Sequence, residues 1–154
     1  MTFRYEDKLT VFFSEKILSF FENMRESYDF HLESGGILIG VLNSEKMVTV
    51  TDVSRPYPKD VREKYRFKRV DPNHQSFMDS AWENSGFQKM YFGEWHTHCE
   101  DIPNPSRIDI SGWKSKSHGK RNAPLLLFLI LGKKALRLWT VDRNEIKELI
   151  PDAE

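Results

Sequence analysis

Hydrophobic and polar positions follow two different periods along this chain, and the period in each segment predicts its secondary structure. Between residues 15 and 27, apolar side chains recur three and four positions apart, which is typical of a helix with one buried face. Other segments alternate with a period of two or are continuously apolar, as strands are. The predicted strands are 9–13, 37–42, 47–53, 61–70, 89–98, 125–131 and 135–141.

The predicted helices begin at residues that suit helix starts. Ser14 is a good N-cap for the first helix. The buried face of that helix is expected to consist of Ile17, Leu18, Phe20, Phe21 and Met24. A second helix is predicted from Asp71-Pro72-Asn73 to about residue 84, because proline suits a first helical turn. A third is predicted from Ser106 to near Gly119.

Composition narrows the class of protein. With 154 residues, 39% of them hydrophobic and 30% charged, the chain predicts one folded globular domain spanning 1–154. The net charge is +0, so the overall electrostatic field of the protein does not favour binding to nucleic acid or to a membrane. The single cysteine, Cys99, cannot form an intramolecular disulfide, and the charged N-terminus does not resemble an export signal. We therefore expect a cytoplasmic protein.

Basic residues recur at alternate positions of the predicted strand 61–70, where they would share one face. They are Arg62, Lys64, Arg66 and Lys68. A solvated strand face is the ordinary interpretation, and the neutral net charge disfavours the alternative of a nucleic-acid surface. This face, or the segment 112–121 with Trp113 and several lysines, is also a candidate docking surface for an acidic protein.

The strongest chemical signal is Gly93-Glu94-Trp95-His96-Thr97-His98, followed by Ser106-Arg107-Ile108-Asp109. Successive strand residues point to opposite faces, so His96 and His98 are expected to share a face. With Ser106 as N-cap, Asp109 falls at the third helical position, where the helix dipole favours a carboxylate. Two imidazoles and a carboxylate suit a catalytic zinc ion, because three protein ligands leave a fourth position for water.

Each half of this pattern also has an ordinary structural interpretation. The H-x-H motif alone is typical of a polar strand face, and S-x-x-D alone resembles a helix capping box. Their conjunction at this spacing favours the metal site. Zinc lowers the pKa of a bound water to about 7, which makes hydroxide available at neutral pH.

A zinc site of this kind needs a base that accepts the proton of the water and passes it to the leaving group. Glu33 is the leading candidate, because it precedes Gly35-Gly36, a pair that permits close backbone approach, and then a buried strand. Glu94, which has the same strand parity as the histidines, and Glu100, in a loop expected to be mobile, are alternatives. Cys99 offers a different mechanism as a thiol nucleophile, but its side chain is expected to be packed or weakly exposed.

These residues resemble the signature of the JAMM, or MPN-plus, metalloproteases, a distant glutamate followed by H-x-H-x7-S-x-x-D. The resemblance implies an α/β sandwich of the cytidine deaminase-like type, with a curved mixed β-sheet flanked by helices. It also implies cleavage of isopeptide or peptide bonds after the tail of ubiquitin or a ubiquitin-like protein. The roles it implies are one Zn²⁺ ion on His96, His98 and Asp109, acid/base catalysis by Glu33 and oxyanion stabilisation by Ser106.

Within this family, the chain is similar to the small bacterial JAMM proteins of type II CBASS antiphage operons, also labelled integrative and conjugative element proteins. That similarity implies a deconjugase, which removes a cGAS-like nucleotidyltransferase from targets joined to its C-terminal tail by an E1/E2-like partner of the same operon. Processing of a ThiS/MoaD-like sulfur carrier and a non-catalytic MPN interaction module are alternatives. One departure is Cys99, where proline is common, and this substitution puts the stiffness of the loop in doubt.

Overall fold

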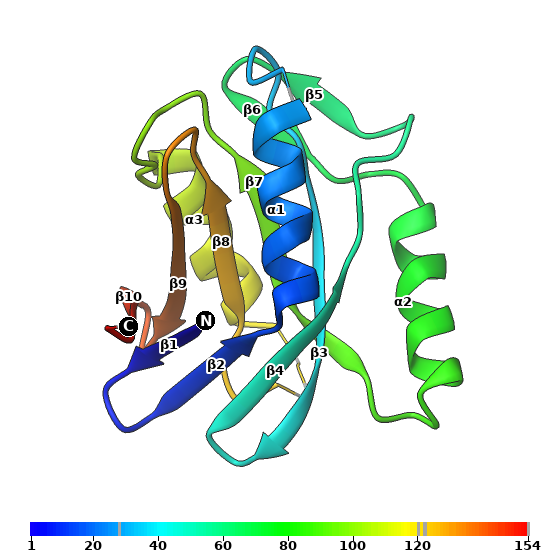
Figure 1. The fold of residues 1–154 in the computed structure, drawn as a ribbon, viewed down its shortest axis with the longest axis vertical. Coiled ribbons are helices and arrows are strands. Elements are labelled where there is room, and N and C mark those ends of the chain that lie inside the picture. Colours follow the sequence, from blue (N-terminus) through cyan, green and yellow to red (C-terminus); the bar gives the residue numbers. More distant parts are fainter. Residues whose placement is uncertain (28, 120, 122, 154) are drawn as a thin grey trace.

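The computed structural model describes residues 1–27, 29–119, 121 and 123–153, which fold around one mixed β-sheet (Figure 1). In chain order the elements are β1 (Thr2–Tyr5), β2 (Leu9–Phe13), α1 (Glu15–Ser27), β3 (Gly35–Ser44), β4 (Met47–Val53), β5 (Val61–Glu63), β6 (Arg66–Lys68), α2 (Asn73–Asn84), β7 (Met90–Thr97), α3 (Arg107–Ser117), β8 (Leu127–Leu131), β9 (Leu136–Asp142) and β10 (Glu145–Pro151).

The main sheet closes into a barrel with the strand order β1-β10-β9-β8-β7-β3-β4-β2. Neighbouring strands are antiparallel, except for the parallel pairs β2 with β4 and β7 with β8. The predicted mixed α/β fold is confirmed, but the predicted sandwich is wrong, because the sheet closes on itself. Closure depends on the pairing of β1 with β10, through Phe3 and Pro151, and the hydrophobic pattern had predicted neither strand.

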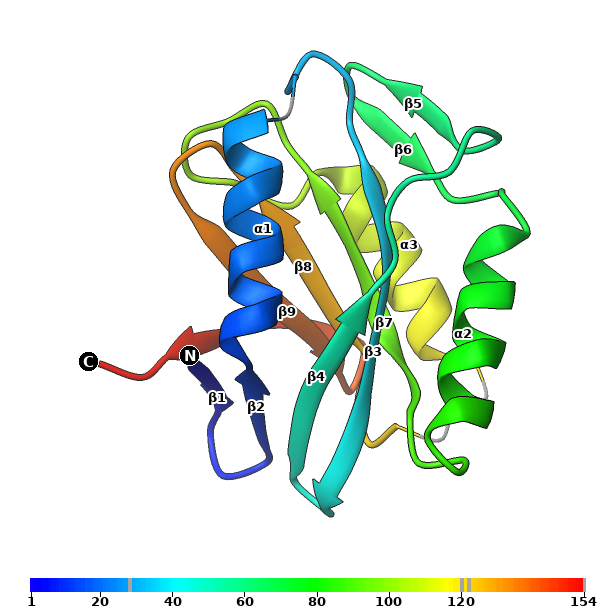
Figure 2. The same ribbon diagram turned by 45° about the vertical axis from the view of Figure 1, so that its right-hand side comes forward.

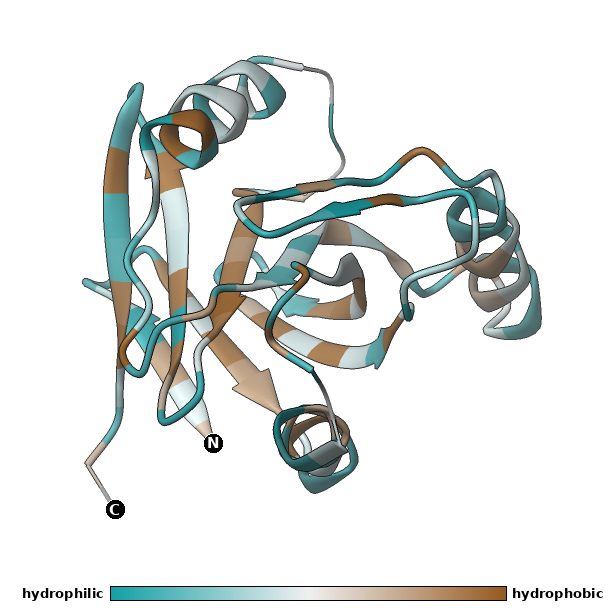
Figure 3. Ribbon diagram, turned by 90° about the horizontal axis from the view of Figure 1, so that it is seen from above, coloured by the Kyte–Doolittle hydropathy of each residue, from teal (hydrophilic) through white to brown (hydrophobic). Residues whose placement is uncertain are grey.

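The three helices lie on different sides of the strands when the molecule is viewed from above (Figure 3). Helix α1 crosses the sheet (Figure 2) and buries Ile17 and Phe21, while its other predicted contact residues are partly buried against the core. Trp113 anchors α3 to the barrel, since it is 2% exposed and stacks on Phe128 with ring centroids 5.0 Å apart. None of the described helices is long and apolar enough to cross a membrane.

The predicted single strand over 61–70 is wrong, because the chain turns between β5 and β6 and forms a separate hairpin. Cross-strand pairing puts Arg62 opposite Phe67 on one face of this hairpin, while Glu63 faces Arg66 on the other. The turn reverses the chain, so the four basic residues do not share one face. The division of the basic residues between two faces, and the pairing of Arg66 with an acidic residue, weaken the interpretation of this segment as a nucleic-acid surface.

The second predicted docking surface, the segment 112–121, is also changed by the structure. Trp113 belongs to the core, so it is not free to contact a partner. Lys116 is exposed but pairs with Glu94, its Nζ lying 2.7 Å from Glu94 Oε1. Residue Lys120 of this segment lies outside the described residues.

Strands β7 and β8 approach each other closely at Gly93. A Cβ atom built there would lie 1.8 Å from the backbone oxygen of Leu127, and the φ angle of +147° is one that side chains disfavour. The glycine that opens the histidine motif is therefore required for packing of the strand that carries the histidines.

Replacement of Gly93 by alanine is expected to lower the free energy of unfolding by about 2–4 kcal/mol, because the methyl group collides with β8 at an unfavourable φ. Gly112→Ala is the matched control, since a Cβ there meets no atom within 4 Å. An alanine in the middle of α3 should add roughly 0.5–1 kcal/mol. Urea unfolding measures both changes, and unaltered stability of Gly93→Ala would contradict the close strand packing.

Candidate active site

Both histidines of the motif stand at the end of β7. His96 precedes the last residue of the strand, Thr97, and His98 follows it. The Nε2 atoms of the two histidines are 3.0 Å apart, and both residues are buried. Thr97 points away from them, and its hydroxyl accepts a hydrogen bond from the backbone N–H of Ser34 at 2.9 Å. The predicted parity of the strand is confirmed.

Asp109 reaches the histidines from the first turn of α3. Ser106 is the N-cap; its Oγ accepts from the backbone N–H of Asp109 at 3.1 Å, and its own N–H donates to Asp109 Oδ2 at 2.9 Å. This capping box fixes the direction of the carboxylate. Asp109 Oδ1 lies 3.2 Å from His96 Nε2, and Oδ2 lies 3.1 Å from His98 Nε2.

The three side chains fit a tetrahedral metal centre. Ligand atoms about 2.0 Å from a zinc ion lie about 3.3 Å from one another; the two Nε2 atoms are 3.0 Å apart, and each of them has a different oxygen of Asp109 at 3.2 or 3.1 Å. Ligand atoms of Glu33, His96 and His98 also lie within 4.8 Å of one another. Asp109 is the better third ligand, because its oxygens contact both rings, whereas no ion pair within the described structure joins Glu33 to either ring.

Glu33 lies two residues before β3, next to the end of β7. The two strands are antiparallel with Gly35 opposite His96, and the Thr97 N–H donates to the Ser34 carbonyl at 2.8 Å. Glu33 is only 6% exposed. Burial raises the pKa of Glu33 to about 7, although the charges of the two histidines oppose this shift. A carboxyl group with a pKa near neutrality suits transfer of protons in both directions.

Glu100 orients His98 from the side opposite to the candidate metal position. His98 Nδ1 lies 2.9 Å from Glu100 Oε1, so a proton held on Nδ1 leaves Nε2 free to act as a ligand. Burial lowers the pKa of His98, but the contacts with Asp109 and Glu100 outweigh burial and raise this pKa to about 9. Burial raises the pKa of Asp109, yet hydrogen bonds with both histidines outweigh that effect and hold it well below its usual value.

Hydrogen bonds to backbone carbonyls hold the loop 99–105, which connects the histidines to α3. The Lys133 N–H donates to the Glu100 carbonyl at 2.7 Å, and the Arg137 guanidinium donates to the Pro103 carbonyl at 2.9 Å. These bonds attach the loop to the segment that follows β8, whereas the mobility expected around Glu100 stays a prediction. Hydrogen bonds join the loop to the turn between β8 and β9, although Cys99 occupies a position where proline, which would stiffen the loop, is common.

Glu94, predicted as an alternative base, and Cys99, predicted as an alternative nucleophile, lie in environments that differ from that of Glu33. Both carboxylate oxygens of Glu94 accept from Lys116 Nζ, at 2.7 and 2.8 Å, so this group is engaged in an ion pair. Cys99 is exposed, which corrects the expectation of a packed or weakly exposed thiol, because the chain leaves the strand after Thr97 and alternation stops there. Among the described residues Cys99 has no hydrogen bond to a histidine, as an activated thiol would require.

His96, Asp109 and Glu33 line a cleft of about 340 Å³ between the β5–β6 hairpin and α3. Hairpin residues 65–69 form one wall, Ile108 and Lys116 of α3 lie on the other, and Trp95 lies beside His96. Ser106 is exposed and is hydrogen-bonded to Asp109, which lines this cleft. Because its Oγ accepts from Asp109, the serine hydroxyl keeps its own proton for donation to another oxygen.

Two features of this site were not predicted. Sequence reasoning treated Glu100 as a rival base, although its position two residues after His98 is compatible with a supporting contact to that ring. It also did not predict that a hairpin forms the outer wall of the cleft. That wall depends on packing between segments that are remote in the chain.

A pH-dependent stability follows from the burial of Glu33. Its pKa rises from the ordinary 4.5 to about 7, so its contribution to stability is present below the lower value and is lost as the pH rises through the higher one. Glu33→Gln should therefore raise the Tm of the metal-free protein more at about pH 8 than at about pH 5. Glu45→Gln, in the exposed turn after β3, is the control and should change little at either pH. Thermal unfolding with equal shifts for Glu33→Gln at both pH values would contradict a burial effect.

Comparison with known proteins assigns the family. Residues 23–142 match the family described as prokaryotic homologs of the JAB domain. The chain belongs to this family, which confirms the resemblance found in the sequence. A solution structure of protein DSY2949 from Desulfitobacterium hafniense has a TM-score of 0.62 and 17% identity, covering 90% of this chain and 88% of that one, and shows a similar fold.

Several relatives carry a functional name. A protein of Escherichia coli (strain TW11681) named CD-NTase/cGAS isopeptidase is 34% identical over 143 residues, covering 93% of this chain and 88% of the relative. A protein of Vibrio cholerae serotype O1 with the same name is 32% identical over 146 residues, covering 95% and 91%. A third, from Pseudomonas aeruginosa, is 32% identical over 131 residues, covering 85% and 82%.

Proposed function

We propose that this protein is a zinc-dependent isopeptidase that cleaves after the C-terminal tail of a cGAS-like nucleotidyltransferase and thereby reverses its conjugation to targets in antiphage defence. The observation that carries this proposal is the convergence of His96, His98 and Asp109 beside the buried carboxyl group of Glu33. The names of the relatives support the substrate class. A conjugating partner of the E1/E2 type stays a prediction.

The chemistry can be divided among these residues. His96, His98 and Asp109 would hold a Zn²⁺ ion, which supplies a Lewis acid that polarises a carbonyl and lowers the pKa of water. Glu33 would accept a proton from the water whose oxygen attacks the scissile carbonyl carbon. It would return that proton to the leaving amine as the C–N bond breaks. The hydroxyl of Ser106 would donate a hydrogen bond to the developing oxyanion.

The cleft suits an extended peptide. Within the described structure β6 pairs only with β5, which leaves the backbone groups of its other edge available. An extended tail can add to such an edge through main-chain hydrogen bonds. Because residues 65–69 and His96 line the same cleft, a tail bound along β6 would lead toward the candidate metal centre.

Replacement of Glu33 by glutamine should reduce turnover by about 10²–10⁴-fold, because the amide keeps the volume of the side chain but cannot carry the proton. Zinc content and binding of the tail should persist. The assay is single-turnover cleavage of a reporter protein joined to the C-terminal tail of a cGAS-like nucleotidyltransferase, with calorimetry of an uncleaved tail peptide.

Two controls accompany this assay. Glu94→Gln changes a glutamate of the same cleft and should keep most of the turnover, since Glu94 is paired with Lys116. A second reporter joined to a sulfur-carrier tail tests the alternative substrate, and its preferred cleavage would redirect the proposal. Normal turnover by Glu33→Gln would remove Glu33 as the base and return attention to Glu94 or Glu100.

Replacement of Asp109 by asparagine should weaken zinc affinity by more than about 100-fold, because it removes the charged third ligand. Glu100→Gln should weaken it by about 10–100-fold, since this contact only orients His98. Asp101→Asn is the control, an exposed carboxylate 3.5 Å from Lys134 in the same loop. Competition with a chromophoric chelator measures all three. Parent-like affinity of Asp109→Asn would favour a ligand set that includes Glu33 instead.

A further inference from the structure

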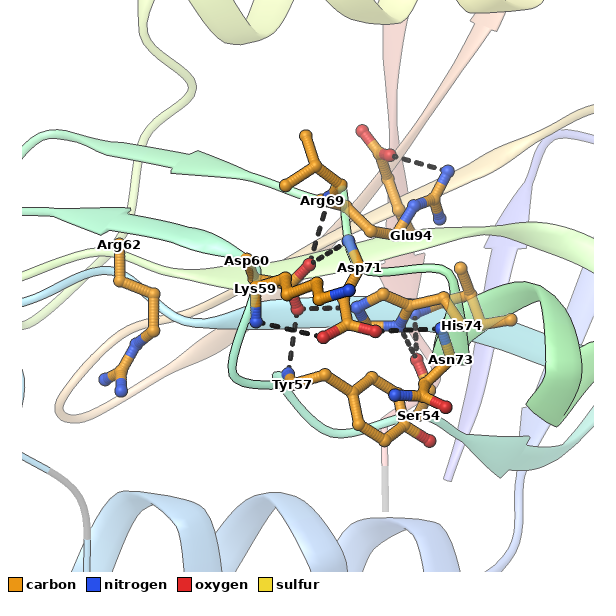
Figure 4. Close-up of polar contacts among 12 residues, drawn as sticks. Ser54, Tyr57, Lys59, Asp60, Arg62, Arg69, Asp71, Asn73, His74 and Glu94 are labelled. Carbon is orange, nitrogen blue, oxygen red and sulfur yellow. Dashed lines mark hydrogen bonds and ion pairs between the residues drawn. The ribbon is translucent and has the colours of Figure 1, made fainter.

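A buried chain of hydrogen bonds lies at the base of the β5–β6 hairpin (Figure 4). Ser54 Oγ lies 2.7 Å from His74 Nδ1, and His74 Nε2 lies 2.6 Å from Asp60 Oδ2. All three residues are at most 9% exposed. They come from three segments: the end of β4, the loop before β5 and the first turn of α2. Neither the proposed chemistry nor the ligand set uses them.

The order Ser-His-Asp resembles a hydrolytic triad, but the environment of the serine excludes that role. Ser54 is 0% exposed, so no substrate reaches its hydroxyl. Its Oγ accepts from the backbone N–H of Ile37 at 2.8 Å, which directs the hydroxyl proton toward His74 Nδ1. His74 then donates from Nε2 to Asp60. The three side chains form a relay of structural hydrogen bonds.

Asp60 joins the two ends of the hairpin. In addition to the bond with His74, the Asp60 carboxylate accepts hydrogen bonds from three backbone N–H groups. These belong to Tyr57 at 2.8 Å, Val70 at 3.0 Å and Asp71 at 2.9 Å. Tyr57 precedes β5, whereas the other two residues follow β6. Burial raises the pKa of Asp60, but these hydrogen bonds outweigh burial and lower it, so the group is an anion in the folded protein.

The hydrogen-bonded network of Ser54, His74 and Asp60 is called the clamp below. Ser54 joins the clamp to the central sheet. It contacts β3 through the N–H of Ile37, and its carbonyl accepts from the indole N–H of Trp95 at 2.9 Å. Trp95 lies on β7 immediately before His96. The base of the hairpin is thus connected through buried bonds to the two strands that carry the candidate site.

The hairpin in turn holds Glu33. The backbone N–H of Glu33 donates to the Glu63 carbonyl at 2.8 Å, and Arg62 Nε donates to the Glu33 carbonyl at 3.2 Å. Phe67 packs directly over Gly35, where a Cβ atom would lie 2.6 Å from its ring. A displacement of the hairpin would therefore move the backbone of Glu33 and one wall of the cleft together.

We infer that Asp60, acting through His74 and Ser54, is a positioning residue that locks the β5–β6 hairpin onto the sheet and so places Glu33 and the wall of the substrate cleft. Its effect on turnover rests on the proposed function. Its effect on the hairpin does not. None of the three residues contacts the candidate ligands directly, so zinc binding should be independent of this clamp.

The test compares Asp60→Asn with Asp142→Asn in the zinc-loaded full chain. Asp142 is a matched control on the barrel, where it accepts from the Tyr5 hydroxyl at 2.9 Å and pairs with Lys8 at 3.0 Å, away from the cleft. Asp60→Asn should keep one zinc ion, raise KM for the tail-linked reporter about tenfold and lower kcat about 10–100-fold, because both wall and base are displaced. Asp142→Asn should reduce Tm without changing either constant. Equal effects of the two variants on KM and kcat would overturn the inference.

A second measurement is independent of activity. Exchange of the Glu33 backbone N–H, followed by NMR, should accelerate by more than about tenfold in Asp60→Asn and remain unchanged in Asp142→Asn. Should Asp60→Asn fail to fold, His74→Ala replaces it, and His74→Gln, which retains a donor toward Asp60, should restore part of the protection. Unchanged protection in the Asp60 or His74 variant would overturn the inference. If the parent protein cleaves no reporter, the proposed function fails, while the exchange result still decides the role of the clamp.

Discussion

The antiparallel pairing of β3 with β7 is the constraint on which the candidate site depends. It sets Gly35 opposite His96, and therefore brings Glu33 from the segment before β3 to the end of β7, where both histidines project. The absence of a side chain at Gly35 permits this register, because a Cβ atom there would lie 2.4 Å from the Trp95 carbonyl. A wider separation of the two strands would remove the carboxyl group of Glu33 from the histidines.

Two carboxyl groups of the same site are adapted to different tasks by their surroundings. Glu33 is buried without an ion pair to either histidine in the described structure, and burial raises its pKa to about 7. Asp109 is also partly buried, but its contacts with His96 and His98 lower its pKa. Separation of two pKa values in this way distinguishes a group that exchanges protons from one that remains charged. This difference supports Glu33 as acid/base and Asp109 as ligand.

The hairpin shows why alternation alone was insufficient. Residues 61–70 have the period of one strand, yet the chain turns inside them, so Arg62 faces Glu33 while Arg66 lies on the other face. The clamp at the base of the hairpin could not be predicted from the sequence either. Ser54, Asp60 and His74 belong to three different segments, and only their burial in one place turns ordinary polar residues into a connected network.

The sequence by itself determined the local elements and the identity of the candidate site. Periodicity predicted α1 and β4, the residues that suit helix starts predicted α3, and the spacing of His96, His98 and Asp109 predicted which side chains would meet, because strand parity and helix capping are local rules. Only the tertiary structure decided the closed barrel, the support of His98 by Glu100 and the wall formed by the hairpin. The barrel and the hairpin wall depend on contacts between segments whose proximity is set by packing of the whole chain, and hydrophobic periodicity does not encode that proximity. The contact of Glu100 with His98 is local in sequence, but the backbone of Glu100 is bonded to Lys133 in the remote turn after β8.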